Sequence, residues 1–339
     1  MKRLLAAAWL ALATPAAAQQ ATPLFAADTP IHLTITAPLQ QLMRNRESHQ
    51  QLPGTLAADD GQLLPVTLKL RGITRRTAEV CEFAPLRIDF TGKPPANSLF
   101  AGQNKLKLVT HCRNTPAFQQ HLLLEYAAYR MFNQLGPRSF RVRLAQIDYR
   151  DSAGRPSLTR AGFLIEDLGD VARRNGTRET RAGERIPVAD LSPLEAARYG
   201  LFQHMIANHD WSMRAGPAGD NCCHNAELIG PLGPGSVIPL PYDFDFSGLV
   251  GAPYATPPDV LGISDVRQRL YRGYCLHNGA ALAAAREMRA QRPQMLGVLA
   301  QVPGLAPATQ ARATAFLERF FADIATDDGV AKTVKRCIG

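Results

Sequence analysis

The hydrophobic and polar positions in the first half of the chain alternate in short segments, which is typical of β-strands. This alternation predicts strands over 30–36, 85–90, 104–112, 139–149 and 161–168. The segment 54–72 is predicted to form a hairpin, because Asp60–Gly61 supplies a turn between two alternating runs. Most of the first half is therefore expected to be sheet.

Helical periodicity appears once in the first half, over 115–136, and prevails in the second half. Thr115 can cap the early helix, Pro116 suits its first turn, and Gly136 follows its end. Further helices are predicted over 192–208, 279–291 and 308–325. Conspicuous polar residues lie near the point where the character of the chain changes. We therefore expect an α+β protein with two lobes and a cleft: an antiparallel sheet lobe with one long helix over 19–170, and a mainly helical lobe over 171–339.

The N-terminus has the layout of a secretory signal peptide, for which we expect the bounds 1–18. Lys2 and Arg3 are followed by an apolar stretch from Leu4 to Leu12 and by an A-x-A site at Ala16–Ala18. No later uncharged segment is long enough for a transmembrane anchor. The net charge of +9 comes from basic residues spread along the chain, which does not favour nucleic-acid binding. We expect an exported protein, periplasmic or extracellular.

An even number of cysteines in an exported chain indicates disulfides. The six are Cys81, Cys112, Cys222, Cys223, Cys275 and Cys337. Cys81 and Cys112 flank predicted strands and are the first pair expected, while Cys337 would secure the C-terminal tail. The adjacent Cys222 and Cys223 are expected to bond to two different partners. The alternative for them is a zinc site with His224, although consecutive ligands lack the usual spacing.

The sequence PLPYDFDFSG, residues 239–248, places two aspartates two positions apart on an apparent strand. Asp243 and Asp245 would share one face of that strand, and aromatic residues would occupy the other: Tyr242, Phe244 and Phe246. Two neighbouring carboxylates repel each other unless a cation lies between them. The pattern fits a cation site, or alternatively a solvated edge strand with an acidic outer face.

Glu125 lies on the apolar stripe of the helix 115–136. Its residues recur every three or four positions, about once per helical turn: Phe118, Leu122, Glu125 and Tyr129. A buried carboxylate needs a partner, and the preceding strand offers Lys105 and Lys107 on one face. The alternative is that Glu125 lies at the margin of the stripe and reaches water.

Polar residues also follow the helix 192–208, in the order Asn208, His209 and Asp210. A loop then leads to Asn225 and the acidic strand. The chain thus contains, in order, a strand lysine, a helix glutamate, a loop aspartate, an asparagine and a strand aspartate. This is the order of functional groups in a protein-kinase-like phosphoryl-transfer site.

The chain resembles the spore-coat CotH-type secreted kinases from about Leu68 to Leu249. The segment LRGITRR (70–76) is similar to their R-G-x-S-R segment, and LEYAAYRMFNQLG to the helix after their core strands. AGFLIEDL resembles their G-x-Y-x-x-x-E strand, and PYDFDFSG resembles their W-D-x-D-x-x-x-G metal strand. The last match is the most specific. The resemblance implies a two-lobed kinase-like fold.

By this resemblance, ATP with Mg or Mn is the expected cofactor set. The implied ATP-binding residues are Lys107 or, as second choice, Lys105, with Glu125 as partner, Glu166 on the strand under the adenine, and Arg71 in place of a phosphate loop. The implied catalytic residue is Asp210. The implied metal ligands are Asn225 and Asp243, assisted by Asp245.

The chain departs from the kinase pattern in three places. Asp210 and Asn225 lie further apart than in H-R-D-x-x-x-x-N, no G-x-G-x-x-G loop precedes the lysines, and no A-P-E motif follows Asp243. The expected activity is phosphoryl transfer to an unidentified extracytoplasmic protein or small molecule, with nucleotidyl transfer left open. The rivals are a catalytically silent binding module, and a metal-dependent phosphoesterase using Asp210, Asp243, Asp245 and His209.

Overall fold

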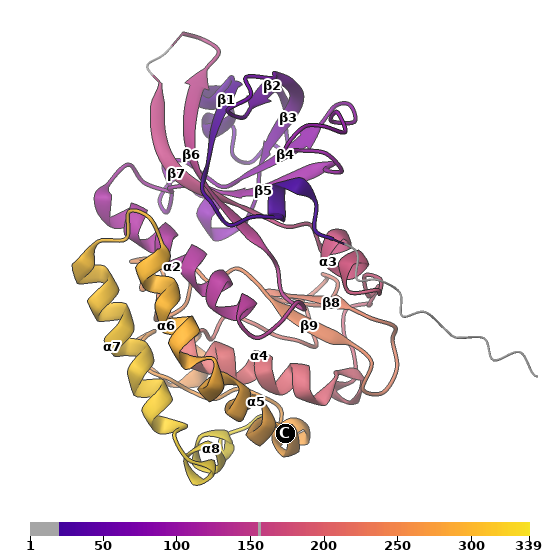
Figure 1. Cartoon of the computed structure of the whole chain (residues 1–339), viewed down its shortest axis with the longest axis vertical. Helices are drawn as coiled ribbons and strands as arrows, with labels where there is room; N and C mark the ends of the chain where they lie inside the picture. Colours follow the sequence, from indigo (N-terminus) through magenta and orange to yellow (C-terminus); the bar gives the residue numbers. More distant parts are fainter. Residues whose placement is uncertain (1–19, 155–156) are drawn as a thin grey trace, which may run out of the picture.

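Seven strands form a closed barrel in this computed structural model, which describes residues 20–154 and 157–339 (Figure 1). The strands are β1 (Ile31–Ala37), β2 (Leu52–Ala57), β3 (Leu64–Leu70), β4 (Leu86–Phe90), β5 (Lys105–Val109), β6 (Val142–Asp151) and β7 (Leu158–Ile165). Their order around the barrel is β1-β2-β3-β4-β5-β7-β6. All neighbours pair antiparallel except β1 and β6, which run parallel with Ile31 opposite Ala145 and Ala37 opposite Asp151. This parallel pair closes the barrel, so its strands have no open edge.

The expected two-lobed kinase-like fold with an antiparallel sheet lobe is wrong. The structure has a closed seven-stranded barrel of mixed pairing, accompanied in the described residues by eight α-helices. The predicted strand at 30–36 does form, as β1, but its partners are both β2 and the distant β6. Alternation shows that a segment is a strand and which residues share a face, but it does not identify the partner strand. The closure of the barrel was therefore not visible in the pattern.

Most of the helices follow the barrel in the chain and lie below it in Figure 1. They are α1 (Leu39–Arg44), α2 (Pro116–Asn133), α3 (Leu168–Arg174), α4 (Pro193–Ile206), α5 (Asn278–Ala290), α6 (Arg292–Gln301), α7 (Pro307–Asp323) and α8 (Asp327–Val334). Beside them a two-stranded sheet joins β8 (Ala226–Ile229) to β9 (Ile238–Pro241). The predicted cap of α2 is confirmed, because the side chain of Thr115 accepts a hydrogen bond from the backbone N–H of Phe118.

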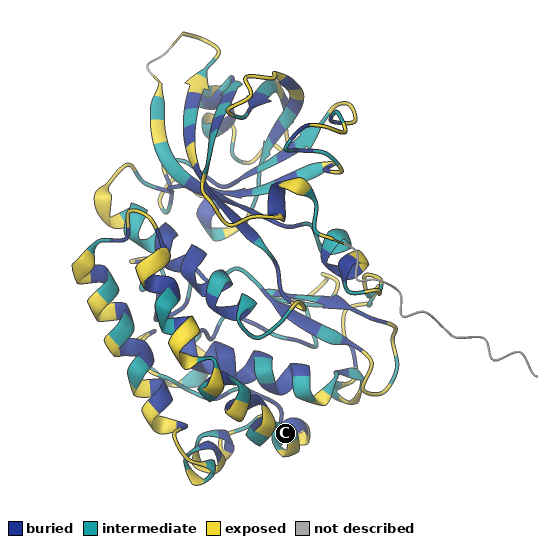
Figure 2. Ribbon diagram, in the orientation of Figure 1, coloured by how far each residue is buried: buried dark blue, intermediate teal, exposed yellow. Residues whose placement is uncertain are grey.

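The hydrophobic residues form separate cores inside the barrel and among the helices (Figure 2). Leu33, Ile35 and Leu68 are completely buried in the barrel. The helical core centres on α4 and extends to the barrel through α2, which contacts β6, β7 and α6. Tyr129 of α2 packs edge-on against Phe163 of β7, with ring centroids 5.6 Å apart. The long predicted helix thus connects the barrel to the helices.

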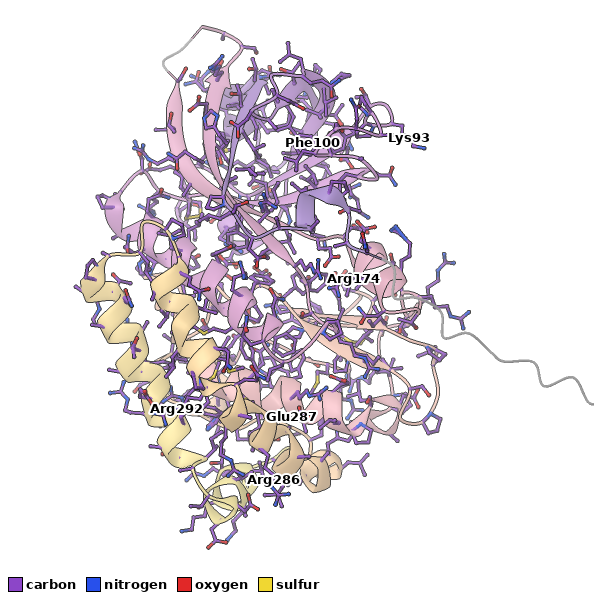
Figure 3. The ribbon with its side chains drawn as sticks, viewed as in Figure 1. Lys93, Phe100, Arg174, Arg286, Glu287 and Arg292 are labelled. Atoms are coloured by element: carbon purple, nitrogen blue, oxygen red, sulfur yellow. A yellow bond between two sulfur atoms is a disulfide. The ribbon has the colours of Figure 1, made fainter. Side chains whose placement is uncertain are left out.

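Ion pairs reinforce the contact between elements. Arg174, which is labelled in Figure 3, lies at the end of α3. It binds both carboxylate oxygens of Glu166, which is fully buried just after β7. Arg198 of α4 forms a two-pronged ion pair with Glu287 of α5 at 2.5 and 2.8 Å. Paired nitrogen and oxygen atoms of this kind fix orientation as well as distance.

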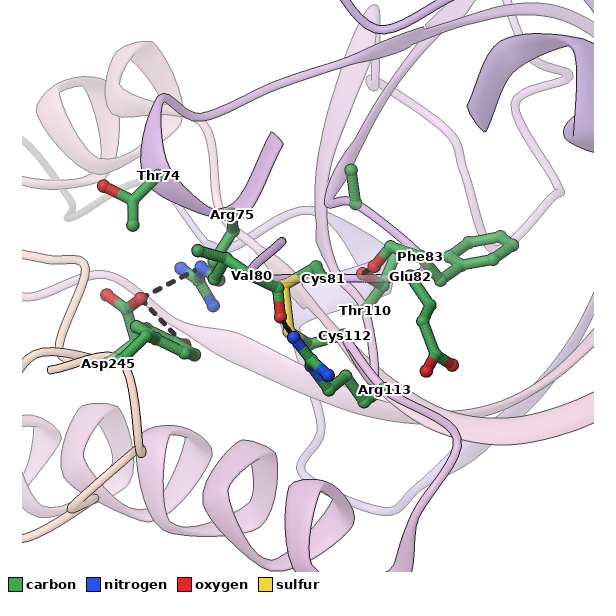
Figure 4. The surroundings of a disulfide bond; sticks show 12 residues. Thr74, Arg75, Val80, Cys81, Glu82, Phe83, Thr110, Cys112, Arg113 and Asp245 are labelled. Atoms are coloured by element: carbon green, nitrogen blue, oxygen red, sulfur yellow. Dashed lines mark hydrogen bonds and ion pairs between the residues drawn. A yellow bond between two sulfur atoms is a disulfide. The ribbon is translucent and has the colours of Figure 1, made fainter. Parts of the chain in front are cut away.

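All six cysteines form disulfides: Cys81–Cys112, Cys275–Cys337 and Cys222–Cys223. The expected Cys81–Cys112 bond is confirmed, and it joins the loop after β3 to the end of β5 (Figure 4). Cys337 secures the C-terminal tail as expected. The expectation that Cys222 and Cys223 bond to different partners is wrong, because the other four cysteines pair among themselves. The pairing also removes the alternative zinc site.

Disulfides are typical of proteins in an oxidising compartment, such as the periplasm or the cell exterior. The predicted signal peptide lies outside the described residues. Among the described helices, none has the length and apolar character required to cross a membrane.

The disulfides should differ in their effect on stability. Replacing Cys81 and Cys112 by serine opens a loop of 31 residues and should lower the free energy of unfolding by roughly 3 kcal/mol. Replacing Cys222 and Cys223 should lower it much less, because their bond encloses no intervening chain. Urea unfolding measures both changes in the free energy of unfolding.

Titration of unfolded, unreduced protein should find no free thiol, because all six cysteines are paired. Two or more free thiols would contradict the pairing.

Buried histidines should make the fold sensitive to acid. Burial lowers the pKa of His204, in α4, to about 4 from its ordinary 6.5, and does the same to His111. The unfolded chain therefore binds protons at a higher pH than the folded chain. Stability from these residues is complete above pH 6.5 and is lost as the pH falls towards 4, by up to roughly 3 kcal/mol for each residue.

His204→Gln should reduce this pH dependence in unfolding experiments between pH 7 and about 4.5. The exposed His49→Gln is the matched control and should leave the dependence unchanged. An identical slope in all three proteins would contradict the assignment.

Candidate active site

A cleft of about 540 Å³ opens between the segment after β3 and the loops around β8 and β9. One side, the rim, consists of residues 71–75. The other side, the wall, is formed by parts of 210–225 and 242–246, including Asp210, Asn225 and Asp243. A larger hollow of about 860 Å³ lies beside α3, but its arginines are exposed and it contains none of the predicted site residues.

Asp243 and Asp245 do not lie on a strand, because β9 ends at Pro241. The backbone of Asp243 has φ 60°, in the left-handed region that few residues other than glycine adopt. Its N–H donates to the hydroxyl of Tyr129 at 2.8 Å. Phe244 is completely buried, with its ring centroid 4.6 Å from that of Tyr129, as expected for the aromatic face. Tyr242 and Phe246, however, line the cleft together with the aspartates, so the expected two-faced strand is wrong. The two carboxylates therefore reach the cleft from a tight turn.

Glu125 is buried, as predicted, but its partner is Arg75 and not Lys107. Nη1 of Arg75 lies 2.8 Å from Oε2 of Glu125, and Nη2 lies 3.3 Å from Oε1. The same guanidinium reaches Asp243 Oδ1 at 2.5 Å through Nη2 and Asp245 Oδ2 at 3.1 Å through Nε. Asp245 Oδ2 also accepts a hydrogen bond from the hydroxyl of Tyr254 at 3.0 Å. One cation thus contacts three carboxylates, a group we call the carboxylate cluster; Figure 4 shows Arg75 beside Asp245.

The charges of the carboxylate cluster do not balance. Burial alone would lower the pKa of Arg75, but the charges of Asp245, Glu125 and Asp243 together raise it well above its ordinary value. Arg75 is therefore always charged. Burial raises the pKa of Glu125 and of Asp245, and the negative charge of Asp243 raises both further, whereas Arg75 lowers them. We take the net direction for both carboxyl groups to be upward, because a single guanidinium cannot neutralise three carboxylates.

The two candidate lysines point away from Glu125. Lys107 Nζ lies 3.6 Å from Oε1 of Glu227 on β8 and over the rings of Phe140 and Tyr242. Burial lowers its pKa, although Glu227 acts in the opposite direction. Lys105 Nζ pairs with Asp167 at 3.1 Å. The expected Lys107–Glu125 pair is wrong, because the alternation of β5 turns Lys107 towards β8.

Two other predicted residues differ in their access to the cleft. Arg71 lines it at the rim. Glu166 does not line the cleft, because both its oxygens are bound by Arg174 and one also accepts from the backbone N–H of Arg141. Its carboxylate thus has a structural role within the fold.

Asp210 is held at the wall by two neighbours from the following loop. Its Oδ1 lies 2.7 Å from Nε2 of His224, and its Oδ2 accepts from Nδ2 of Asn225 at 2.9 Å. The backbone of Asn225 is left-handed, with φ 48°. The hydrogen bond with Asp210 raises the pKa of His224, against the effect of burial. The predicted Asp210, Asn225 and Asp243 thus lie together on one wall.

His209, by contrast, is buried outside this group. Its Nε2 lies 2.8 Å from the carbonyl oxygen of Gln268, and burial lowers its pKa. The sequence pattern did not identify His224 as the partner of Asp210, or Arg75 as the partner of Glu125. His224 stands directly before Asn225, which is a usable local signal, whereas Arg75 is 50 residues from Glu125.

No protein-family model matches the chain, and no curated protein sequence is significantly similar to it. The function must therefore be argued from the geometry of the site.

Because the pKa of Asp245 is raised, the substitution Asp245→Asn should stabilise the folded protein increasingly as the pH rises. A carboxyl group whose folded pKa is raised contributes stability at low pH, and that contribution is lost as the pH rises through the folded value. Asparagine removes this loss and can still accept a hydrogen bond from Arg75. Unfolding in the presence of EDTA at several pH values should show the stability of the variant rising relative to wild type between pH 4 and 8.

Asp220→Asn is the control for this experiment, because Asp220 also lines the cleft but is exposed. Its stability relative to wild type should not change with pH. A parallel response of the two variants would show that Asp245 is not destabilised by its burial.

Proposed function

We propose that the chain is an exported phosphotransferase that uses ATP and a divalent cation, Mg or Mn, to modify an extracytoplasmic protein or small-molecule acceptor. The observation that carries this proposal is the grouping of Asp210, Asn225 and Asp243 on one wall of a cleft, facing a rim that contains Arg71. Phosphoryl transfer needs little covalent chemistry from the protein and depends mainly on positioning and charge. The arrangement supplies both.

Asp243 and Asn225 suit a hard divalent cation. Mg²⁺ prefers carboxylate and amide oxygens, and the side chain of Asp243 is 30 % exposed at the cleft. Asn225 directs its amide nitrogen to Asp210, which leaves its oxygen as an acceptor. A divalent cation at these residues would offset the charge of the nucleotide phosphates.

Asp210 has the properties of a general base for the acceptor hydroxyl. His224 and Asn225 fix the orientation of its carboxylate, and each oxygen retains a further lone pair for an incoming proton. The side chain is 30 % exposed, so an acceptor can reach it.

The basic residues near the cleft contribute unequally to phosphate binding. Arg71 lies at the rim and can contact an anion directly. Lys107 is tied to Glu227, so a phosphate would compete with that carboxylate for the ammonium group. Arg71 is therefore the first phosphate contact on this proposal.

A silent binding module is the second candidate, and one observation favours it. Arg75 already contacts three carboxylates of the site and supplies one positive charge there, which reduces the need for a metal ion. The phosphoesterase alternative has less support, because His209 is buried against Gln268 and does not line the cleft.

Thermal unfolding with metal and nucleotide tests the proposal. Mg or Mn should raise the melting temperature, and ATP should add to the increase; a ligand at a hundredfold excess over its Kd stabilises by about 2.7 kcal/mol. Asp243→Asn should remove most of the metal-dependent shift and abolish phosphoryl transfer, measured by ATP turnover with periplasmic or secreted extract as acceptor. Asp210→Asn should retain the shift and lose transfer.

Phe244→Asp is the contrasting variant, because Phe244 is completely buried and the substitution should damage the fold itself. A shift that persists in Asp243→Asn would place the metal elsewhere. Absence of any shift in the wild-type protein at millimolar ligand would contradict the enzyme and favour the silent module.

A further inference from the structure

The guanidinium of Arg75 lies where an ion bound by the carboxylate cluster would have to lie. Oxygens of Glu125, Asp243 and Asp245 approach within 4.8 Å of one another. An ion at the usual distance of about 2.0–2.6 Å from such oxygens would share their common centre. Arg75 directs three nitrogens at the same three carboxylates, at 2.8, 2.5 and 3.1 Å. Arg75 and an ion bound by all three carboxylates therefore exclude each other.

Burial divides the carboxylate cluster into an inner and an outer part. The side chains of Glu125 and Asp245 are 2 % and 5 % exposed, and that of Arg75 is 9 % exposed. Asp243 is 30 % exposed and faces the cleft. The guanidinium thus contacts all three carboxylates, and Asp243 is the member of the cluster whose side chain is most accessible from the cleft.

Arg75 also connects the rim to the wall of the cleft. It lies in a single 3₁₀ turn, Thr74–Arg76, which follows Gly72 with its φ of 83°. Its partners Glu125 and Asp243 are 50 and 168 residues away in sequence. Gly72 and Thr74 line the cleft beside it. The ion pairs of Arg75 therefore determine where the rim lies relative to Asp243.

We propose that Arg75 is a built-in cation and a positioning residue: it keeps divalent ions out of the inner carboxylates and holds Asp243 at the cleft. Only the role of Asp243 as a metal ligand rests on the proposed function. The replacement of the Arg75 cation by a divalent ion depends on Arg75 and the three carboxylates and does not require phosphoryl transfer. It follows that deleting the Arg75 side chain converts the carboxylate cluster into a new divalent-cation site.

The test is Mn²⁺ binding to Arg75→Ala without nucleotide, followed by the EPR signal of free Mn²⁺. The variant should bind one Mn²⁺ more than wild type, and about tenfold or more tightly than any wild-type site, because three carboxylates lose the counter-charge that they share. Adding Glu125→Gln to the variant should abolish the extra site. Millimolar guanidinium chloride should raise the melting temperature of Arg75→Ala by several degrees and compete with Mn²⁺.

Two matched controls separate this role from a merely structural one. Arg76→Ala removes the neighbouring arginine of the same turn, for which the described structure records no ion pair, and should gain neither Mn²⁺ nor guanidinium binding. Arg75→Lys retains a cation and should also gain no Mn²⁺ site. Tetramethylammonium, which has no N–H donors, should not replace guanidinium.

Each outcome has a distinct meaning. An Arg75→Ala protein that binds no additional Mn²⁺ and does not respond to guanidinium overturns the inference. The inference is also overturned if Arg75→Ala fails to fold even when Mn²⁺ or guanidinium is added, although Arg75→Lys folds. Extra Mn²⁺ sites in Arg75→Ala that survive Glu125→Gln also overturn it. If the extra site appears but wild-type protein transfers no phosphate, the inference holds and the proposed phosphotransferase fails.

Discussion

The structure depends on one buried guanidinium that contacts carboxylates from two distant parts of the chain. Arg75 comes from the 3₁₀ turn that follows β3, Glu125 from the middle of α2, and Asp243 and Asp245 from the turn after β9. Removing an ion from water costs several kcal/mol, and attraction offsets this only when the geometry is good. The ion pairs are therefore formed only if rim, helix and turn are correctly placed, so they couple the barrel to the wall of the cleft.

The hydrophobic core makes that placement possible. Phe244, between the two aspartates, is fully buried among Tyr129 and Phe202. The hydroxyl of Tyr129 accepts the N–H of Asp243 and supports its left-handed backbone, which would otherwise be strained. Because Tyr129 lies one turn after Glu125 on α2, the same helix supplies a carboxylate to Arg75 and a hydrogen bond to Asp243. The aromatic packing and the ion pairs thus both hold the turn after β9 against α2.

The local sequence pattern was sufficient to predict features that depend mainly on neighbouring residues. Thr115 and Pro116 marked the start of α2, the stripe through Leu122 placed Glu125 in the interior, and the aromatic residue between the aspartates was correctly expected to be buried. The partner strands and ion-pair partners that lie far away in sequence depend on the topology of the fold, and the pattern could not predict them. The parallel pairing of β1 with β6 joins segments more than a hundred residues apart, and the partner of Glu125 lies on a loop whose path the alternation does not define. Lys107 was the plausible partner because it is near in sequence, yet the pleat of β5 directs it to Glu227.

The carboxylates of the site cannot all perform the same task, because their environments differ. Asp245 and Glu125 are enclosed with Arg75 and hold the fold together, whereas Asp243 and Asp210 remain accessible at the cleft. Asp210 has its own orienting partners, His224 and Asn225, and does not depend on Arg75. An acidic pair that looks symmetrical in the sequence D-F-D is therefore divided by the fold into an enclosed residue and an accessible one. What separates them is burial: the same guanidinium contacts both aspartates, but Asp245 is 5 % exposed and Asp243 is 30 % exposed at the cleft.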